Sequence, residues 1–287
     1  MAGYGRIRGG YTDMNIREKM KLFYENPVVA WHEHMWITGD YDFDKLDVKQ
    51  ADGIREVMDV LGIDKIVTSI PVNSIKRCDP EIFRAANNTT FEATKRYPGK
   101  VYGMAYVHPG HLSSALDEID RCITELGFVG IKLYYDYFMD DPAYFPIIEK
   151  CIDLDIPILQ HSMHCMDAPN HIRQPLCSDG VHMANAARRY PEATFLMGHF
   201  SIAEWKWSLK AIADTPNVYT DIGGSVYDRP QMEEAVELLG ARRMLYATDN
   251  GFSAATGRIL GAEISEEDKK TILAGTDFLR FIEKAGR

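Results

Sequence analysis

The chain has 287 residues, 46% hydrophobic and 26% charged, a composition typical of a soluble globular protein with one large domain or two ordinary ones. Its 42 acidic and 32 basic residues give a formal net charge of −10, which argues against nucleic acid or an anionic membrane as a partner. No apolar run is long enough to span a membrane, and the first fifteen residues lack the apolar centre of a signal peptide. We therefore expect an intracellular, cytoplasmic protein.

Eight short runs of apolar or β-branched residues recur along the chain and are typical of buried strands. They lie at residues 27–37, 65–72, 101–109, 128–135, 156–163, 194–200, 217–224 and 243–250. Segments with helical spacing lie between them, for example 51–62, 112–127, 142–155 and 205–216. This alternation predicts an α/β fold, a single-domain (β/α)8 barrel. An open doubly wound sheet is the alternative, but no glycine-rich phosphate turn follows the first strand.

The chain contains neither a low-complexity linker nor a sequence repeat of twenty to fifty residues. We therefore divide it only into an N-terminal extension with a short helix, residues 1–27, and the barrel, residues 28–287. The barrel is predicted to end in one helix over residues 266–284, with Ser265 as its N-cap and acidic residues in its first turn.

The five cysteines are odd in number and contain no C-x-x-C pair. This pattern suggests neither a disulfide framework nor a cysteine zinc site. We expect reduced, mostly buried side chains at Cys78, Cys122, Cys151, Cys165 and Cys177.

The first strand, "PVVAWHEHMWI", carries two histidines one residue apart, His32 and His34. Side chains alternate along a strand, so both imidazoles are predicted to point the same way. Strict alternation places them on one face with Val28 and Ala30, and places Glu33 on the other face. An isolated H-x-H pattern is short and common, and two hydrogen-bonded histidines at a strand end would explain it equally well.

Repetition of the pattern favours a metal site. His161 ends the fifth apolar run, His199 ends the sixth, and Asp249 ends the eighth. In a parallel barrel the carboxyl ends of the strands meet at one face, so these side chains are expected to converge with those of the first strand. Imidazoles and one carboxylate suit a borderline divalent ion, with zinc the first choice and manganese the alternative.

Six motifs recur along the chain in a characteristic order: "HEH", "ELGFVGIKLYY", "IPILQHS", "FLMGHFS" with "NVYTDIGGS", "LYATDN" and "SEEDKKTILAGT". Each motif is weak alone, but their order and spacing resemble the amidohydrolase superfamily, specifically the amidohydrolase-2 branch that contains the aminocarboxymuconate-semialdehyde decarboxylase-like enzymes. The resemblance covers nearly the whole chain from about Val28 to the last helix.

The resemblance implies roles for the strand-end residues. His32, His34, His161 and Asp249 match the family's metal positions. His199 matches the histidine of the sixth strand, which in many mononuclear members acts on the substrate or on metal-bound water. The chain departs from the family where "NGF" replaces a Pro-containing motif after Asp249, and where bulky residues, "FSIAEWKW", follow His199 in place of glycine.

Lys132, in "GIKLYY", allows several interpretations. In related binuclear enzymes a fourth-strand lysine is carboxylated and bridges two metals, which requires the unprotonated amine. The structural alternative is a lysine paired with Asp136 or Asp249, and a Schiff-base lysine would leave the histidines unexplained. We favour one divalent ion and an unmodified Lys132 that contacts substrate, with a second metal only if Lys132 is carboxylated.

Three further residues are candidate substrate contacts. Arg173 lies in residues 163–177, which we interpret as a specificity loop, and its guanidinium suits a substrate carboxylate. Tyr134 and His108 follow strands four and three and could line the pocket. A solvated arginine, a packed tyrosine and a hydrogen-bonded loop histidine are the structural alternatives.

These residues predict a metal-dependent hydrolase that cleaves an amide, ester or lactone bond of a small, carboxylate-bearing molecule. A bound ion lowers the pKa of water from about 15.7 toward neutrality. Asp249 would take the proton, and His199 would stabilise the developing oxyanion. A metal-dependent decarboxylase or hydratase of the same branch is the alternative, and a non-catalytic metal-binding barrel is the second alternative. If the chain self-associates, we expect a homodimer.

Overall fold

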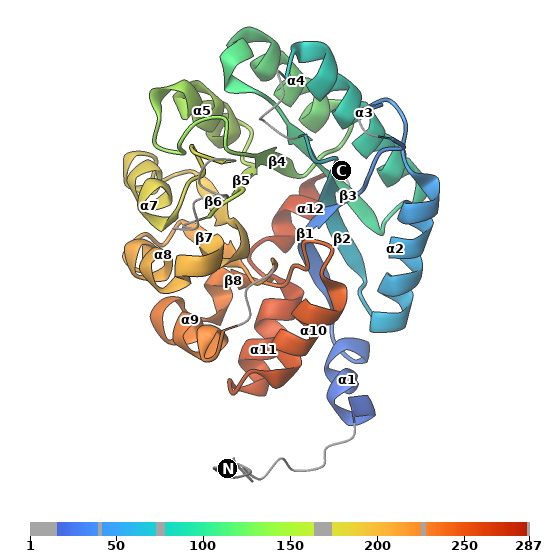
Figure 1. Cartoon of the computed structure of the whole chain (residues 1–287), viewed down its shortest axis with the longest axis vertical. Helices are drawn as coiled ribbons and strands as arrows, with labels where there is room; N and C mark the ends of the chain where they lie inside the picture. Colours follow the sequence, from blue (N-terminus) through green and yellow to red (C-terminus); the bar gives the residue numbers. More distant parts are fainter. Residues whose placement is uncertain (1–15, 40–41, 73–77, 164–173, 225–227, 286–287) are drawn as a thin grey trace, which may run out of the picture.

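The computed structural model shows eight parallel strands arranged in chain order as one sheet, with helices around it (Figure 1). It describes residues 16–39, 42–72, 78–163, 174–224 and 228–285. Each strand lies inside one of the eight predicted runs, so the (β/α)8 fold is confirmed. The strands are β1 (Val29–His34), β2 (Lys65–Ser69), β3 (Val101–Tyr106), β4 (Gly130–Leu133), β5 (Pro157–Gln160), β6 (Thr194–Met197), β7 (Val218–Asp221) and β8 (Met244–Leu245).

Helices connect successive strands and cover the outside of the barrel, as right-handed parallel connections require. None of the helices in the described ranges is both long and apolar enough to cross a membrane. The helices are α1 (Ile16–Tyr24), α2 (Val48–Leu61), α3 (Pro80–Arg96), α4 (Leu112–Thr124), α5 (Phe145–Asp153), α7 (Gly180–Arg189), α8 (Trp205–Ile212), α9 (Gln231–Leu239), α10 (Phe252–Gly261), α11 (Glu266–Ala274) and α12 (Leu279–Ala285).

Helix α1 lies within the predicted N-terminal extension, and its Phe23 packs edge-to-face against Tyr246, which directly follows β8. The boundary between extension and barrel stays a prediction. The described cysteines, residues 78, 122, 151 and 177, are buried free thiols, as expected from their spacing.

The barrel closes between β1 and the chain that follows the short β8. The backbone amide of Trp31 donates to the carbonyl of Tyr246 at 2.9 Å, and the amide of Asp249 donates to the carbonyl of His32 at 2.9 Å. Closure therefore brings residue 249 directly beside the end of the first strand.

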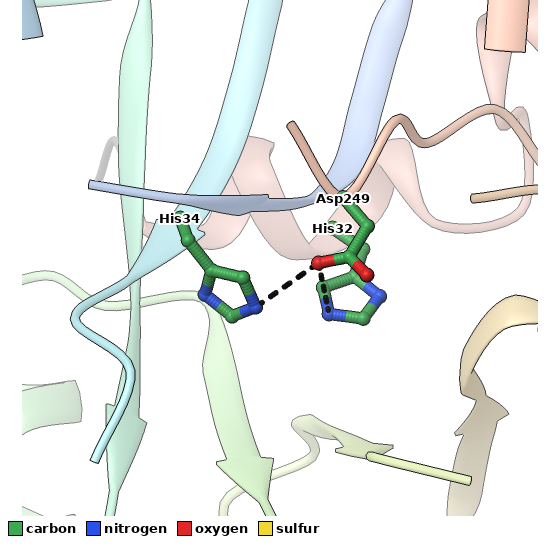
Figure 2. Close-up of side chains that lie close together, drawn as sticks. All are labelled: His32, His34 and Asp249. Atoms are coloured by element: carbon green, nitrogen blue, oxygen red, sulfur yellow. Dashed lines mark ion pairs between the residues drawn. The ribbon is translucent and has the colours of Figure 1, made fainter. Parts of the chain in front are cut away.

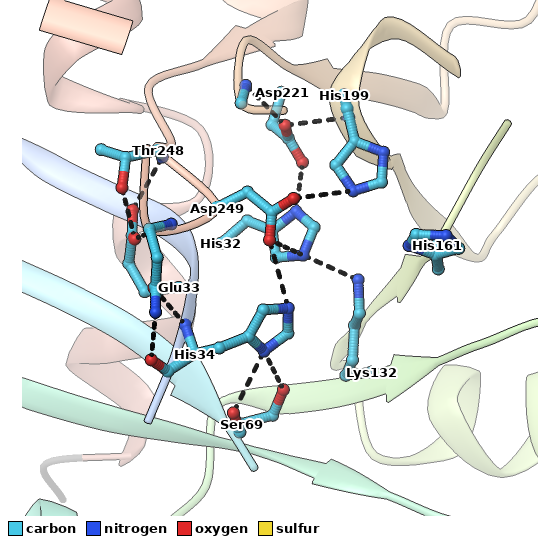
Figure 3. Close-up of polar contacts among 12 residues, drawn as sticks. His32, Glu33, His34, Ser69, Lys132, His161, His199, Asp221, Thr248 and Asp249 are labelled. Atoms are coloured by element: carbon cyan, nitrogen blue, oxygen red, sulfur yellow. Dashed lines mark hydrogen bonds and ion pairs between the residues drawn. The ribbon is translucent and has the colours of Figure 1, made fainter. Parts of the chain in front are cut away.

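An apolar layer fills the amino-terminal part of the barrel interior, and α12 closes the barrel at that end (Figure 1). Phe278, just before α12, makes edge-to-face contacts with Trp31 and Tyr219. The polar side chains of the candidate site lie beyond this layer, at the carboxyl-terminal ends of the strands (Figure 3). Its buried members are Val29, Trp31, Val67, Met104, Val129, Leu159, Leu196, Leu245, Phe278, Phe281 and Ile282.

A β-bulge in β1 corrects the predicted alternation. Ala30 pairs with Ile66, but Glu33 pairs with Thr68, so three steps along β1 match two along β2. Ala30 packs in the outer layer and Trp31 in the interior, and strict alternation would have sent His32 outward. The extra residue lets His32 follow Trp31 into the barrel, so His32 does not share a face with Ala30 as predicted.

The predicted final helix is divided in two. Ser265 caps α11 as expected, its side chain accepting from the amide of Asp268, but α11 ends at Gly275 in a left-handed conformation (φ 59°). A Cβ on Gly275 would lie 2.4 Å from the indole nitrogen of Trp31. The break lets the chain turn beneath the barrel and place Phe278 against Trp31.

We expect Phe278→Ala to lower the free energy of unfolding by about 3–5 kcal/mol, because it removes a fully buried ring and leaves a cavity under the barrel. Urea unfolding would measure this. The exposed Val60 on α2 provides the control, since Val60→Ala should change stability by no more than about 0.5 kcal/mol. A loss below about 1 kcal/mol for Phe278→Ala would show that the packing of Phe278 under the barrel contributes little to stability.

Candidate active site

Seven polar side chains meet at the carboxyl-terminal rim of the barrel (Figure 3). Each lies at or directly after a strand end, where the strands of a parallel barrel converge. They are His32 and His34 from β1, Lys132 from β4, and, at or after β5 to β8, His161, His199, Asp221 and Asp249.

His32, His34 and Asp249 form the tightest group, with one ligand atom from each lying within 4.8 Å of the others (Figure 2). Oδ1 of Asp249 is 3.3 Å from Nε2 of His34 and 3.9 Å from Nε2 of His32. Both histidines are almost fully buried, whereas the Asp249 side chain is 28% exposed and can be reached from solvent. Two imidazole nitrogens and a carboxylate fit a borderline divalent ion.

Asp221, fully buried at the end of β7, fixes the orientation of two histidines. Its Oδ2 accepts from Nδ1 of His32 at 2.9 Å, and its Oδ1 accepts from the backbone amides of His199 (3.0 Å) and Gly223 (2.9 Å). A carboxylate bound to Nδ1 leaves Nε2 of His32 with a lone pair for a ligand. The sequence did not indicate this role, because Asp221 lies inside the predicted run 217–224 although it is the last residue of β7.

Lys132 is fully buried and donates from Nζ to Nε2 of His32 at 2.8 Å. The chain Asp221–His32–Lys132 therefore fixes the tautomer of His32, with the proton on Nδ1. Burial lowers the pKa of the Lys132 amine to about 8, although Asp249 and Asp221 oppose the change. The sequence suggested that Lys132 pairs with Asp136 or Asp249, whereas in the structure its hydrogen-bond partner is His32.

His199 presents a free ring nitrogen to the site. Its Nδ1 donates to the carbonyl of Ser162 at 3.2 Å, and its Nε2 lies 3.6 Å from Oδ2 of Asp249. That Nε2 is buried without a hydrogen-bond partner among the described residues. Burial lowers the pKa of His199 to about 4, against the effect of Asp249, so the imidazole is neutral near pH 7.

The backbone around His199 is held in an unusual conformation. His199 has φ 51°, a left-handed value that costs energy in a residue with a side chain. The hydrogen bond from its amide to Asp221 offsets part of this cost. Gly224 packs against it so closely that a Cβ there would lie 2.6 Å from the Cβ of His199.

His161 stands beside the three-residue group and is not part of it. Its Nε2 lies 3.0 Å from Oε1 of Gln174, and its ring packs edge-to-face on His199 with centroids 4.8 Å apart. Burial lowers the pKa of His161 well below its usual value, and His199 and Lys132 add to the effect. The structure thus brings together three of the four predicted ligands, and ligation by His161 would require its release from Gln174.

The carboxylate of Asp249 remains ionised in this setting. Burial alone would raise its pKa, but the hydrogen bond from His34 and the nearby imidazoles His32 and His199 hold it well below the usual range. An anion at this position balances a cation placed among the histidine nitrogens.

Tyr134 forms an aromatic wall of the site. Its ring contacts the rings of His34 and His161, and Nζ of Lys132 lies 5.1 Å from its centroid. It also packs edge-to-face on Tyr106. Contact with a substrate stays a prediction for Tyr134.

His108 has partners for both ring nitrogens within the protein. Nδ1 accepts from the amide of Gly110 at 3.0 Å and caps the turn that follows β3, and Nε2 lies 3.4 Å from Oδ1 of Asp136. These contacts favour a structural role, and its substrate contact stays a prediction. Arg173 lies outside the described residues, as do His164 and His171.

Glu33 and Asn250 were also missed by the sequence analysis. The buried Glu33 carboxylate accepts from Thr248 and from the backbone of Asn250, and Asn250 in turn bonds the backbone of His34. Burial raises the pKa of Glu33, and the hydrogen bonds that its two oxygens accept from Thr248 and Asn250 oppose this change. The available signal for Glu33 was its position, a charged residue between two histidines on a strand that was expected to be buried.

The amidohydrolase family model matches residues 29–276. Gamma-resorcylate decarboxylase from Polaromonas sp. is 24% identical, over 75% of this chain and 82% of its own length. 2-Keto-4-carboxy-3-hexenedioate hydratase from Sphingobium sp. is 22% identical, over 67% and 69% respectively.

Solved structures give the same architecture. A 2,6-dihydroxybenzoate decarboxylase from Rhizobium superposes with a TM-score of 0.71 at 19% identity, over 90% of this chain and 99% of that one. A dihydroxybenzoic acid decarboxylase from Polaromonas sp., solved with manganese and 2-nitroresorcinol, gives a TM-score of 0.69 at 22% identity, over 91% and 98%. At these identities the superpositions establish the barrel fold.

We expect Asp221→Asn to weaken manganese binding by about 10- to 100-fold, because an amide NH2 facing Nδ1 of His32 would disturb its tautomer and orientation. Isothermal titration calorimetry measures the affinity. Asp214→Asn, which changes a surface carboxylate paired with Arg188, is the matched control and should bind manganese normally. Unchanged affinity in Asp221→Asn would mean that His32 needs no such partner.

The raised pKa of the Asp136 carboxyl group leads us to expect that the stability of the protein depends on pH. Burial raises its pKa from 3.8 to about 7, so the folded protein holds a proton that the unfolded chain has lost between these values. This proton's contribution to the free energy of unfolding is fully present below pH 4. It then falls by up to about 1.4 kcal/mol per pH unit as the pH rises from 4 to 7. The Asp136→Asn variant should therefore gain stability relative to wild type as pH rises from 4 to 7, measured by urea unfolding. If the difference in free energy of unfolding between Asp136→Asn and wild type stayed constant from pH 4 to 7, the raised pKa of Asp136 would be contradicted.

Proposed function

Because the chain belongs to the amidohydrolase family, we propose that it is a metal-dependent lyase, a non-oxidative decarboxylase of a small hydroxylated carboxylic acid. The observation that carries the proposal is the convergence of His32, His34 and Asp249 beside Nε2 of His199, which has no hydrogen-bond partner among the described residues. Relatives named as decarboxylases favour this reaction over the amide, ester or lactone hydrolysis that the sequence analysis ranked first. The relative named as a hydratase supports hydration as the second candidate.

The proposed cofactor is one divalent ion held by His32, His34 and Asp249, with His161 as a further ligand. The carboxylate of Asp221 on Nδ1 of His32 leaves the lone pair on Nε2, which would ligate the ion in place of accepting the hydrogen bond from Lys132. Solved relatives that contain manganese favour that metal over zinc, the first choice from the sequence. Lys132, hydrogen-bonded to His32, is proposed to be unmodified.

When bound, the ion would act as a Lewis acid for a substrate carboxylate or hydroxyl oxygen. Side chains of the protein would carry out the remaining step, which is proton transfer. Decarboxylation breaks a carbon–carbon bond, releases carbon dioxide and leaves an electron pair on the substrate carbon, which must then receive a proton.

His199 is proposed to carry that proton. Because its Nδ1 donates to the Ser162 carbonyl, its Nε2 is the atom that accepts a proton, from a substrate hydroxyl or from water, and returns it to the carbon. The Asp249 carboxylate, 3.6 Å from Nε2, would stabilise the imidazolium formed between these steps. Their neighbouring positions support a catalytic role for both residues.

Substrate contacts are proposed for three residues around this centre. The cationic form of Lys132 and the guanidinium of Arg173 would pair with substrate oxygens, and the Tyr134 ring would pack against an aromatic or conjugated acid. The cytoplasmic location and the homodimer also remain predictions from the sequence.

Replacing Asp249 by Ala should abolish tight manganese binding, whereas His199→Asn should retain the metal and lower turnover by about 100-fold or more. Metal analysis after dialysis and steady-state assays separate the two effects. Full metal content in Asp249→Ala would remove it from the ligand set, and normal turnover in His199→Asn would exclude it from proton transfer.

The reaction class is tested with a panel of hydroxybenzoates, including 2,6-dihydroxybenzoate, and of amides, esters and lactones. A decarboxylase should release carbon dioxide and place solvent deuterium on the carbon that lost it. Incorporation of ¹⁸O from water into a product carboxylate, without carbon dioxide, would instead establish the hydrolase. Turnover of no compound in the panel by manganese-loaded protein would favour the non-catalytic alternative.

A further inference from the structure

Asp249 and Asn250 occupy a backbone conformation that their side chains disfavour. Both residues have positive φ angles, 48° and 61°, in the left-handed region where glycine is usual. They follow the two-residue strand β8, which contributes few backbone hydrogen bonds of its own to hold them. Other contacts must therefore fix the direction of the Asp249 carboxylate.

Glu33 supplies one set of these contacts from β1. Its Oε1 accepts from the amide of Thr248 at 2.7 Å, and its Oε2 accepts from the Thr248 hydroxyl at 2.5 Å and from the amide of Asn250 at 3.1 Å. Glu33 thus bonds the residues on both sides of Asp249. The carboxylate is 1% exposed, so water does not compete for these donors.

Asn250 supplies the second set of contacts, in the opposite direction. Its Oδ1 accepts from the amide of His34 at 2.9 Å, and its Nδ2 donates to the carbonyl of His34 at 2.8 Å. This reciprocal pair fixes the residue after Asp249 to the backbone of His34. The Asp249 carboxylate and the His34 imidazole, 3.3 Å apart, are therefore held by the same network of Glu33, Thr248, Asn250 and His34.

We propose that Glu33 and Asn250 are positioning residues that hold the Asp249 carboxylate in register with His34 and thereby set the affinity of the site for its divalent ion. The inference rests on the proposed metal site. It assigns a role to the glutamate inside "HEH" and to the asparagine that follows the strand-end aspartate.

The chemistry of the contacts separates this role from simple packing. Glutamine has nearly the shape of glutamate but only one acceptor oxygen, so in Glu33→Gln an amide NH2 would face the backbone amide of either Thr248 or Asn250. Glycine tolerates the left-handed conformation better than asparagine but lacks the bonds to His34. Asn250→Gly therefore removes the side-chain contacts without opposing the backbone conformation.

The test measures manganese affinity by isothermal titration calorimetry, the electron paramagnetic resonance spectrum of bound Mn²⁺, and stability by urea unfolding, in the full chain. We expect Glu33→Gln and Asn250→Gly each to weaken manganese binding by about 10- to 100-fold and to alter the spectrum. Glu118→Gln is the matched control, because Glu118 is an equally buried glutamate on α4, bonded to Asn87 and Arg121. The Glu118→Gln substitution should lower the free energy of unfolding and leave the manganese affinity unchanged.

Affinity within about threefold of wild type in either folded variant would overturn the proposal for that residue. If Glu33→Gln fails to fold, Asn250→Gly decides the outcome, since its substitution suits the local φ angle. Asp249→Ala, measured in parallel, distinguishes failure of the underlying site. Retention of metal in Asp249→Ala would reject the site itself, whereas loss there with normal binding in Glu33→Gln and Asn250→Gly would reject only the positioning role.

Discussion

One extra residue in β1 is the constraint on which the candidate active site depends. The bulge between Ala30 and Glu33 lets both Trp31 and His32 enter the barrel, although they are adjacent in sequence. Trp31 can then complete the apolar layer above Phe278, and His32 can meet Asp221 and Lys132. Without the bulge, an apolar floor and an imidazole directly above it could not come from consecutive residues of one strand.

Buried charge at the rim is organised around His32. Asp221 bonds one ring nitrogen and Lys132 the other, so an anion and a cation face each other across a neutral imidazole. Each charge alone would be costly to bury, and the pairing through a fixed ring reduces that cost. Asp249, whose side chain is 28% exposed, lies at the solvent side of this arrangement, and Nε2 of the buried His199 lies 3.6 Å from its carboxylate.

Much of the architecture follows from the sequence. Eight apolar runs alternating with helices predict a parallel barrel, and polar residues near the ends of several runs must then meet at one rim. His34, His199 and Asp249 lie where that argument places them. The bulge in β1 was missed because its signal is a register shift relative to β2, which the sequence of β1 alone does not contain. The break at Gly275 likewise depends on contact with Trp31, a residue more than 240 positions away.

The roles of Glu33, Asp221 and Lys132 were harder to foresee, because each is defined by a partner distant in sequence. Glu33 bonds Thr248, Asp221 bonds His32, and Lys132 takes His32 as its partner in place of an aspartate. The sequence placed hydrolysis before decarboxylation and hydration, whereas relatives named as a decarboxylase and a hydratase favour the alternative reactions. The polar residues at the strand ends predict a metal site, but they do not distinguish between these reactions.

The most direct test of the account is a crystal structure of the protein loaded with manganese, with anomalous diffraction used to locate the ion. The account predicts one strong anomalous peak per chain, in contact with Nε2 of His32, Nε2 of His34 and the Asp249 carboxylate. A peak bonded to other residues, or two peaks bridged by a carboxylated Lys132, would contradict it.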